Sequence, residues 1–291
     1  MDKAPSLADV QALRDQRYHR TPSLRLHSEE DAVAYVNEVG FCFLFGDRSV
    51  EIPALWAAVC GEQRPVPVHH NDGDLGRTWN WKDTLPARGL FHYGKLLRKK
   101  PTLVALDLLP AFYALSPNYG DVNDYLERYA EGQLSYEAKQ VYEALLQNGP
   151  MSTTYLRQEA GLPGGENARR FDRALTELQV ELRIVKSGTA DTGAWGYAYV
   201  YDLFLRRYPD VPEQARVLSG AEAQETLLLR YLRNVVAVSE SDARRLVGWE
   251  PWEWQPLVAR LAERGALRQV SIEGLGEACL LTGDLPVVVG E

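Results

Sequence analysis

The sequence predicts a mainly α-helical fold with small β-hairpin wings, an α+β class, because stretches with helical spacing of apolar residues are followed by short, Gly-bounded apolar runs. The clearest case is residues 164–188, GGENARRFDRALTELQVELRIVKSG, where a Gly-marked turn precedes a helix and then an extended run. Phe171, Leu175, Leu178 and Leu182 share one face of this expected helix. The second observation is that the same pattern returns near the C-terminus.

The first copy of the pattern occupies residues 135–210. Residues 135–147 predict a first helix that Ser135 caps, and the breaker residues NGP at 148–150 end it. Ser152 then caps a short second helix, and the helix and hairpin of the opening stretch complete the set. Helix, short helix, longer helix and hairpin, in this order, are the elements of a winged helix.

The second copy is predicted over residues 219–285. Residues 221–232, 239–248 and 251–264 read as three helices, and Gly265 ends the last of them. Two partly alternating apolar runs around Gly-containing turn residues follow and predict a second wing. The sequence therefore predicts tandem winged-helix domains.

The N-terminal half is organised less clearly. We expect an N-terminal arm at residues 1–27, whose basic stretch would either wrap a DNA groove or be a loose terminus. Residues 28–115 are expected to form a degenerate winged-helix-like domain, in which Ser28 caps a first helix. Residues 116–134 would link this domain to the first clear winged helix.

Charge is unevenly distributed in a chain whose formal net charge is -8. Between Arg77 and Lys100 there are seven Lys or Arg residues and one acid, Asp83, interleaved with Trp, Phe, His and Tyr. Basic and aromatic side chains together suit a phosphate backbone with stacked bases. The alternative is a surface helix with solvated lysines and core-facing aromatics. The DNA-binding candidates of this segment are Arg77, Lys82, Arg88, Lys95, Arg98, Lys99 and Lys100.

The third helix of the first copy adds three further DNA-binding candidates, because the third helix of a DNA-reading winged helix enters the major groove. These residues are Arg169, Arg170 and Arg173. Over residues 166–183, however, four basic residues are balanced by four acids. The basic segment upstream is therefore expected to supply most of any phosphate attraction.

Several classes of protein and site are not indicated by the sequence. It contains no long apolar run and no secretory signal pattern, so we expect a soluble, cytoplasmic protein without a membrane partner. Cys42, Cys60 and Cys279 are scattered, which indicates buried residues. The pair His69 and His70 lacks metal-ligand spacing, and no phosphate or dinucleotide motif is present. No metal and no cofactor are predicted.

The tandem pattern, with WGYAYVYDLFLRRYPD closing its first copy, resembles the YcaQ/AlkZ-type winged-helix proteins. This family includes bacterial DNA glycosylases that act on alkylated and interstrand-crosslinked DNA. The resemblance implies a DNA-repair fold and a Gln-x-Asp or Gln-x-Gln motif shortly after a Gly in the N-terminal domain. The matching stretch here is Gly40 to Phe45, where Phe43 and Phe45 occupy the two polar positions. A phenyl ring can neither accept a proton nor orient water, so the implied chemistry does not transfer.

Asp47 and Glu51 follow this run and are the only alternative catalytic candidates, although carboxylates there are more often surface residues or helix caps. The favoured hypothesis is a DNA-binding protein related to DNA-repair glycosylases that has diverged catalytically, with duplex or damaged DNA as its partner. One alternative is a winged-helix protein-interaction or scaffold module without DNA binding. The other is an active alkyl-DNA glycosylase with a non-standard catalytic residue.

Overall fold

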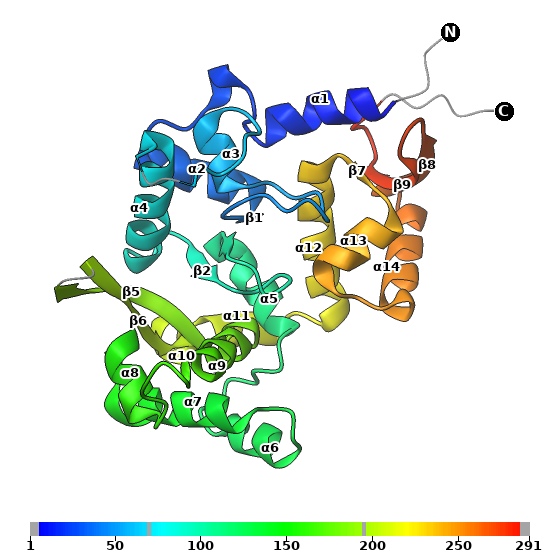
Figure 1. The fold of residues 1–291 in the computed structure, drawn as a ribbon. Coiled ribbons are helices and arrows are strands. Elements are labelled where there is room, and N and C mark those ends of the chain that lie inside the picture. Colours follow the sequence, from blue (N-terminus) through cyan, green and yellow to red (C-terminus); the bar gives the residue numbers. More distant parts are fainter. Residues whose placement is uncertain (1–5, 69–70, 194–195, 286–291) are drawn as a thin grey trace, which may run out of the picture. The chain divides into compact units, whose positions relative to one another are not determined.

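The computed structural model describes residues 6–68, 71–193 and 196–285 (Figure 1). The chain divides into two compact units. The first unit combines Met1–Trp81 with Gln224–Glu291, and the second is Lys82–Ala223. The division falls inside two helices, α4 (Gly73–Ala87) and α12 (Gly220–Val235).

The first unit contains the two ends of the described chain. Its remaining elements are α1 (Leu7–Arg17), the 3-10 turn η1 (Pro22–Leu24), α2 (Glu29–Val39), β1 (Phe41–Phe43), α3 (Leu55–Cys60), β7 (Ala237–Val238), α13 (Glu240–Val247), α14 (Pro251–Glu263), β8 (Leu267–Ile272) and β9 (Gly276–Leu281). Helix α2 begins as the sequence predicts, because Ser28 Oγ accepts a hydrogen bond from the Asp31 N–H (3.1 Å) and the Asp31 carboxylate accepts one from the Ser28 N–H (3.0 Å).

The second unit is built around a long hairpin that extends from a group of helices (Figure 1). Its elements are β2 (His92–Gly94), β3 (Thr102–Val104), the 3-10 turn η2 (Leu106–Leu108), α5 (Leu109–Ala114), α6 (Asp124–Ala130), α7 (Tyr136–Asn148), β4 (Met151–Ser152), α8 (Thr153–Glu159), α9 (Ala168–Val180), β5 (Ile184–Gly193), β6 (Gly196–Leu203), α10 (Phe204–Arg207) and α11 (Val211–Arg216). Strands β2 and β3 pair antiparallel, with Tyr93 opposite Leu103.

One element order occurs in both units. In the second it is α7, β4, α8, α9, β5, β6, with the antiparallel sheet order β4-β6-β5. The other copy is α12, β7, α13, α14, β8, β9, with the sheet order β7-β9-β8. The predicted mainly helical α+β class with small hairpins is therefore confirmed. The repeated order is the one that the sequence predicts for two winged helices.

Helix α9 shows why the sequence pattern was informative and where it misled. Phe171, Leu175 and Leu178 are buried on one face of the helix, as expected. The helix ends at Val180, however, and Leu182 lies beyond it at φ 53°. Leu182 packs with residues of α5, α10 and α11 instead of the core of α7–α9, and its carbonyl accepts a 2.7 Å hydrogen bond from Asn118.

Contacts and compact units bear on three of the expected segments. Within the expected arm, residues 1–27, helix α1 is anchored by Arg14, which is 5% exposed and donates to the carbonyls of Val235 and Ala237. The expected linker, residues 116–134, contains α6, and its Tyr125 belongs to the hydrophobic core of α7–α9. The expected degenerate domain, residues 28–115, is divided between the two units.

Candidate functional site

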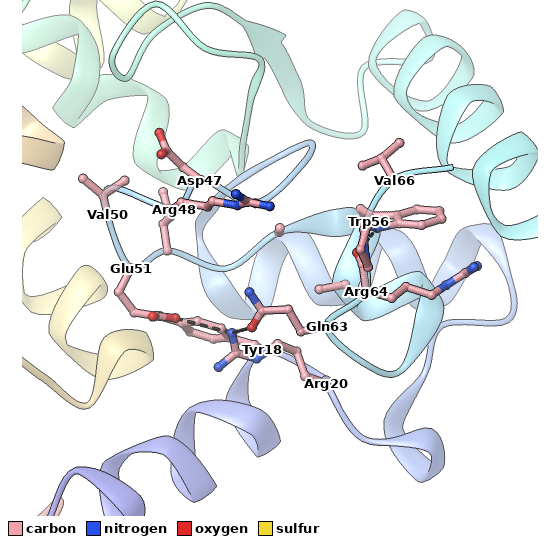
Figure 2. A pocket seen from close by; sticks show the side chains of 15 residues that line it. Tyr18, Arg20, Asp47, Arg48, Val50, Glu51, Trp56, Gln63, Arg64 and Val66 are labelled. Carbon is pink, nitrogen blue, oxygen red and sulfur yellow. Dashed lines mark hydrogen bonds and ion pairs between the residues drawn. The ribbon is translucent and has the colours of Figure 1, made fainter. Parts of the chain in front are cut away.

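A pocket of about 370 Å³ lies in the first unit, where the loop after β1 faces the segment after α3 (Figure 2). The loop contributes Asp47 and Glu51, so both carboxylates proposed from the sequence line the same pocket. Arg20 and Trp56 are further lining residues that the sequence did not single out. The volume is within the range typical of small-molecule sites, roughly 300–1,000 Å³.

Glu51 is held between two guanidinium groups. Arg20 Nη1 donates to Glu51 Oε1 (3.4 Å) and to Gln63 Oε1 (2.9 Å), and Arg14 Nη1 lies 3.6 Å from Glu51 Oε2. The Arg20 guanidinium also covers the ring of Tyr18, at 4.6 Å from the ring centroid. Burial, with the Glu51 charge nearby, raises the pKa of Tyr18 well above its ordinary value. These contacts give Glu51 a structural role in joining α1 to the loop.

Asp47 has a different environment in the same pocket. Its Oδ1 accepts hydrogen bonds of 2.8 Å from both the backbone N–H and the hydroxyl of Ser49. This local ring fixes the turn that follows β1. Figure 2 shows the Asp47 carboxylate apart from Glu51, which lies with Arg20 and Gln63 at the other end of the loop. The two carboxylates therefore share a pocket but do not converge on one point.

Arg64 and Trp56 form another wall of the pocket (Figure 2). The Arg64 guanidinium lies 4.7 Å from the Trp56 ring centroid, and the indole N–H donates to the Arg64 carbonyl (2.9 Å). Asp72 and Asp74 accept hydrogen bonds of 3.0 Å from the Arg64 guanidinium. The bond to Arg64 is the main reason that the pKa of Asp72 is lowered. This wall combines a flat cation with an aromatic ring, which suits stacking.

The two positions that the family resemblance assigns to polar catalytic residues are part of the hydrophobic core. Phe43 is 1% exposed in β1. Phe45 is half-buried and packs edge-on against Trp56 and Trp79, with ring centroids 6.3 and 5.8 Å apart. Neither position presents a proton acceptor.

The predicted DNA-binding residues divide by exposure. Arg77 is half-buried and paired with Asp74, and Lys95 is half-buried in the second unit. Arg88 is exposed beyond the end of α4. The remaining exposed residues are Arg98, Lys99 and Lys100 in the turn between β2 and β3, and Arg169, Arg170 and Arg173 on α9. Arg170 forms an ion pair with Glu137.

Lys82 does not fit the predicted role. It is 1% exposed, and its ammonium donates to Asp83 Oδ1 (2.5 Å) and to the Tyr199 hydroxyl. A phosphate cannot reach an ammonium that is enclosed in this way. The aromatic residues of the basic segment are likewise buried at Trp81, Phe91 and Tyr93, so base stacking on them is not available in this structure.

One hydrogen bond links the basic segment to helix α9. Lys95 Nζ donates to Thr176 Oγ1 of α9 (2.9 Å). Arg173 and Arg169 lie three and seven residues before Thr176, which places all three on the same side of the helix. The part of the basic segment from Lys82 onward lies in the second unit together with α9, whereas Arg77 belongs to the first unit.

Sequence reasoning missed Lys186 and Tyr199. These residues of the β5–β6 hairpin contact Tyr93 and Lys82 of the basic segment. Lys186 Nζ lies 4.4 Å from the Tyr93 ring centroid and 4.1 Å from that of Tyr199. The available signal was the dense run of Tyr residues in β6, which alternate along the strand and so share one face. Nothing local indicates that a lysine from β5 lies among them.

Other features of the chain do not add a site. His69 and His70 lie outside the described residues. Within the described ranges, no group of three or more His, Cys, Asp or Glu side chains is arranged to hold a metal ion. In the same ranges, no helix is both long enough and apolar enough to cross a membrane. Cys42, Cys60 and Cys279 are buried free thiols, as expected.

Comparison with known proteins relates this chain to one protein family and to one solved structure. A family model described as AlkZ-related matches residues 26–248. Among solved structures, the fold is similar to that of the Streptomyces sahachiroi DNA glycosylase AlkZ, with a TM-score of 0.59 and 15% sequence identity, over 96% of this chain and 71% of that one. A search of curated protein sequences found no significant match. Because the family model covers more than half of its residues, the chain belongs to the AlkZ-related family.

Proposed function

We propose that this protein binds duplex or damaged DNA through the second unit and lacks the glycosylase chemistry of its relatives. The observation that carries the proposal is the Lys95–Thr176 hydrogen bond. It joins the segment that carries Arg98, Lys99 and Lys100 to the exposed basic side of α9. Two groups of cations that are separate in sequence are thereby held in the same compact unit.

The charges of this unit support backbone contact more than base reading. Arg98, Lys99 and Lys100 are exposed in a tight turn, with Arg98 at φ 53° and Lys99 at φ 58°. Three consecutive cations in a turn can neutralise neighbouring phosphates without reaching into a groove. On α9, Arg169 and Arg173 are exposed and can extend the same contact.

Catalytic divergence is supported by the packing of β1 and the residue after it. A water-activating residue has to offer an oxygen or nitrogen in the pocket. Phe43 offers neither and is enclosed, and Phe45 is packed between two indole rings. Glu51 is bound to Arg14 and Arg20, which occupies the carboxylate that could otherwise serve.

One observation favours a second candidate function, a glycosylase that uses Asp47. Asp47 lines a pocket large enough for an extruded base, and Trp56 and Arg64 form a flat wall there. Its carboxylate is tied to Ser49 on one oxygen. A catalytic Asp47 would have to act through the remaining oxygen.

Base release from an alkylated duplex, measured beside a binding titration, separates the candidates. The proposal expects salt-sensitive binding with no base release. Base release that is abolished in Asp47→Asn, while binding is retained, would establish the second candidate and overturn the first. No binding at low salt would instead indicate a protein-interaction or scaffold module.

A further inference from the structure

Lys186 lies in an unusual cluster in the second unit. Two tyrosine rings flank its ammonium, Tyr93 from β2 and Tyr199 from β6. Lys82 from α4 reaches the same Tyr199 ring, with its Nζ 5.1 Å from the centroid. Among the described residues, Asp83 is the carboxylate that contacts the cluster, and it is bonded to Lys82 and to the Tyr197 hydroxyl (2.6 Å).

The charge balance of the cluster favours a neutral amine at Lys186. Asp83 already compensates Lys82, so a charged Lys186 adds an excess positive charge to a half-buried site. Burial is the largest cause that lowers the pKa of Lys186, to about 7, and the charges of Lys82 and Lys95 add to it. Asp83 acts in the opposite direction, and the ring faces also favour the cation.

A neutral lysine is a nucleophile, whereas an ammonium is not. An ordinary lysine, with a pKa near 10.4, is neutral in roughly one molecule in 2,500 at pH 7. Lys186 has a far larger neutral fraction at that pH. Its side chain is half-buried, so part of it remains in contact with solvent and a small electrophile has a route to it.

We propose that the Lys186 amine forms imines with aldehydes, and that its substrate class is the open-chain aldehyde of a base-free sugar in DNA. The DNA part of this proposal rests on the proposed function. The Nζ lone pair adds to the aldehyde carbon, and the C=O π pair moves to the oxygen. That oxygen leaves as water after taking one proton from the amine and one from solvent. The product is a protonated imine, whose charge the Tyr93 and Tyr199 rings stabilise as they do the ammonium.

The first test addresses the amine alone. The full chain is treated with formaldehyde and cyanoborohydride at pH 7, and methylation of each lysine is followed by peptide mass spectrometry. Lys139 is the matched control, because it also lies on a tyrosine ring (5.2 Å from the Tyr129 centroid) but is paired with Glu143. Labelling of Lys186 at least tenfold faster than of Lys139 is expected. Equal or slower labelling of Lys186 overturns the proposal, whatever the protein does with DNA.

The second test addresses the substrate class. A duplex that contains one base-free site is incubated with the protein and borohydride, which reduces an imine to a stable secondary amine. A covalent protein–DNA product is expected with the wild type and with Lys139→Arg, and its loss in Lys186→Arg. Duplex binding is titrated in parallel for each protein. Rapid formaldehyde labelling without a trapped product on a bound duplex overturns the DNA aldehyde assignment, whereas failure to bind any duplex counts against the proposed function itself.

Discussion

Lys95 donates a 2.9 Å hydrogen bond to Thr176, and so fastens the segment after β2 to the exposed side of α9. Because both residues lie in the second unit, the exposed cations between β2 and β3 and those of α9 are held by one compact body, whereas Arg77 belongs to the first unit. The lysine expected to be exposed upstream, Lys82, is instead enclosed beside Asp83 and Tyr199. The basic segment thus supplies both surface charge and buried structure.

A buried ion cluster should dominate the stability of the second unit. Arg183 is 1% exposed, is paired with Asp124, and donates to Glu181 Oε2 (2.8 Å). Arg183→Met leaves Asp124 without its buried cation, whereas Glu181 keeps its pair with Arg128, and we expect a loss of about 3 kcal/mol in the free energy of unfolding.

The matched control is Arg216→Met, which breaks an exposed pair with Glu213 and should cost less than about 1 kcal/mol. Urea denaturation of the two variants measures both values. Equal losses in the two variants would show that the buried ion cluster stabilises the fold no more than the exposed pair does.

The position of Phe43 can be tested by introducing the polar residue that the family resemblance expects there. Phe43→Gln places an amide at a 1% exposed site, and we expect a loss of about 3 kcal/mol without any gain of base release. Phe45→Gln is the control, because Phe45 is half-buried and its amide can reach solvent more easily. Thermal unfolding and the base-release assay give the two readouts. Base release by the wild-type protein, in which both positions are Phe, would contradict the account of catalytic divergence.

Stability should fall in mild acid because of His92. This side chain is 1% exposed, and burial lowers its pKa to about 3, below the value of about 6.5 expected in the unfolded chain. Between these values the unfolded state binds the extra proton, so the stability is complete above about pH 6.5 and is lost as the pH falls towards 3.

The expected loss from this residue is about 2 kcal/mol between pH 7 and pH 5. Denaturation at both pH values, compared with His92→Phe, isolates the contribution from that of the carboxylates. The variant should lose about 2 kcal/mol less than the wild type over this interval. The same loss in both proteins would exclude His92 as its source.

Local signals predicted the secondary structure well and the environment of single side chains poorly. Ser135 and Ser239 cap α7 and α13 as expected, since capping depends on residues three positions away. The burial of Lys82 depends on Tyr199, which is far along the chain and invisible to a local pattern. For the same reason, the sequence indicated Glu51 but not its partner Arg20. Leu182 continues the helical spacing of apolar residues in the sequence. In the structure α9 ends at Val180, and Leu182 packs in a different hydrophobic core.

The central claim, that the exposed cations of the second unit bind DNA, is tested most directly by titrating a fluorescent duplex at several salt concentrations. The comparison is between the wild type and Arg98→Glu/Lys99→Glu/Lys100→Glu, with Arg98→Lys/Lys99→Arg/Lys100→Arg as a control that keeps the charge. The account predicts wild-type affinity that falls steeply with salt, the same behaviour in the control, and weak binding in the charge-reversed protein. Loss of three phosphate contacts should reduce the slope of log affinity against log salt by about 3. Equal affinity and an equal slope in all three proteins would contradict the account.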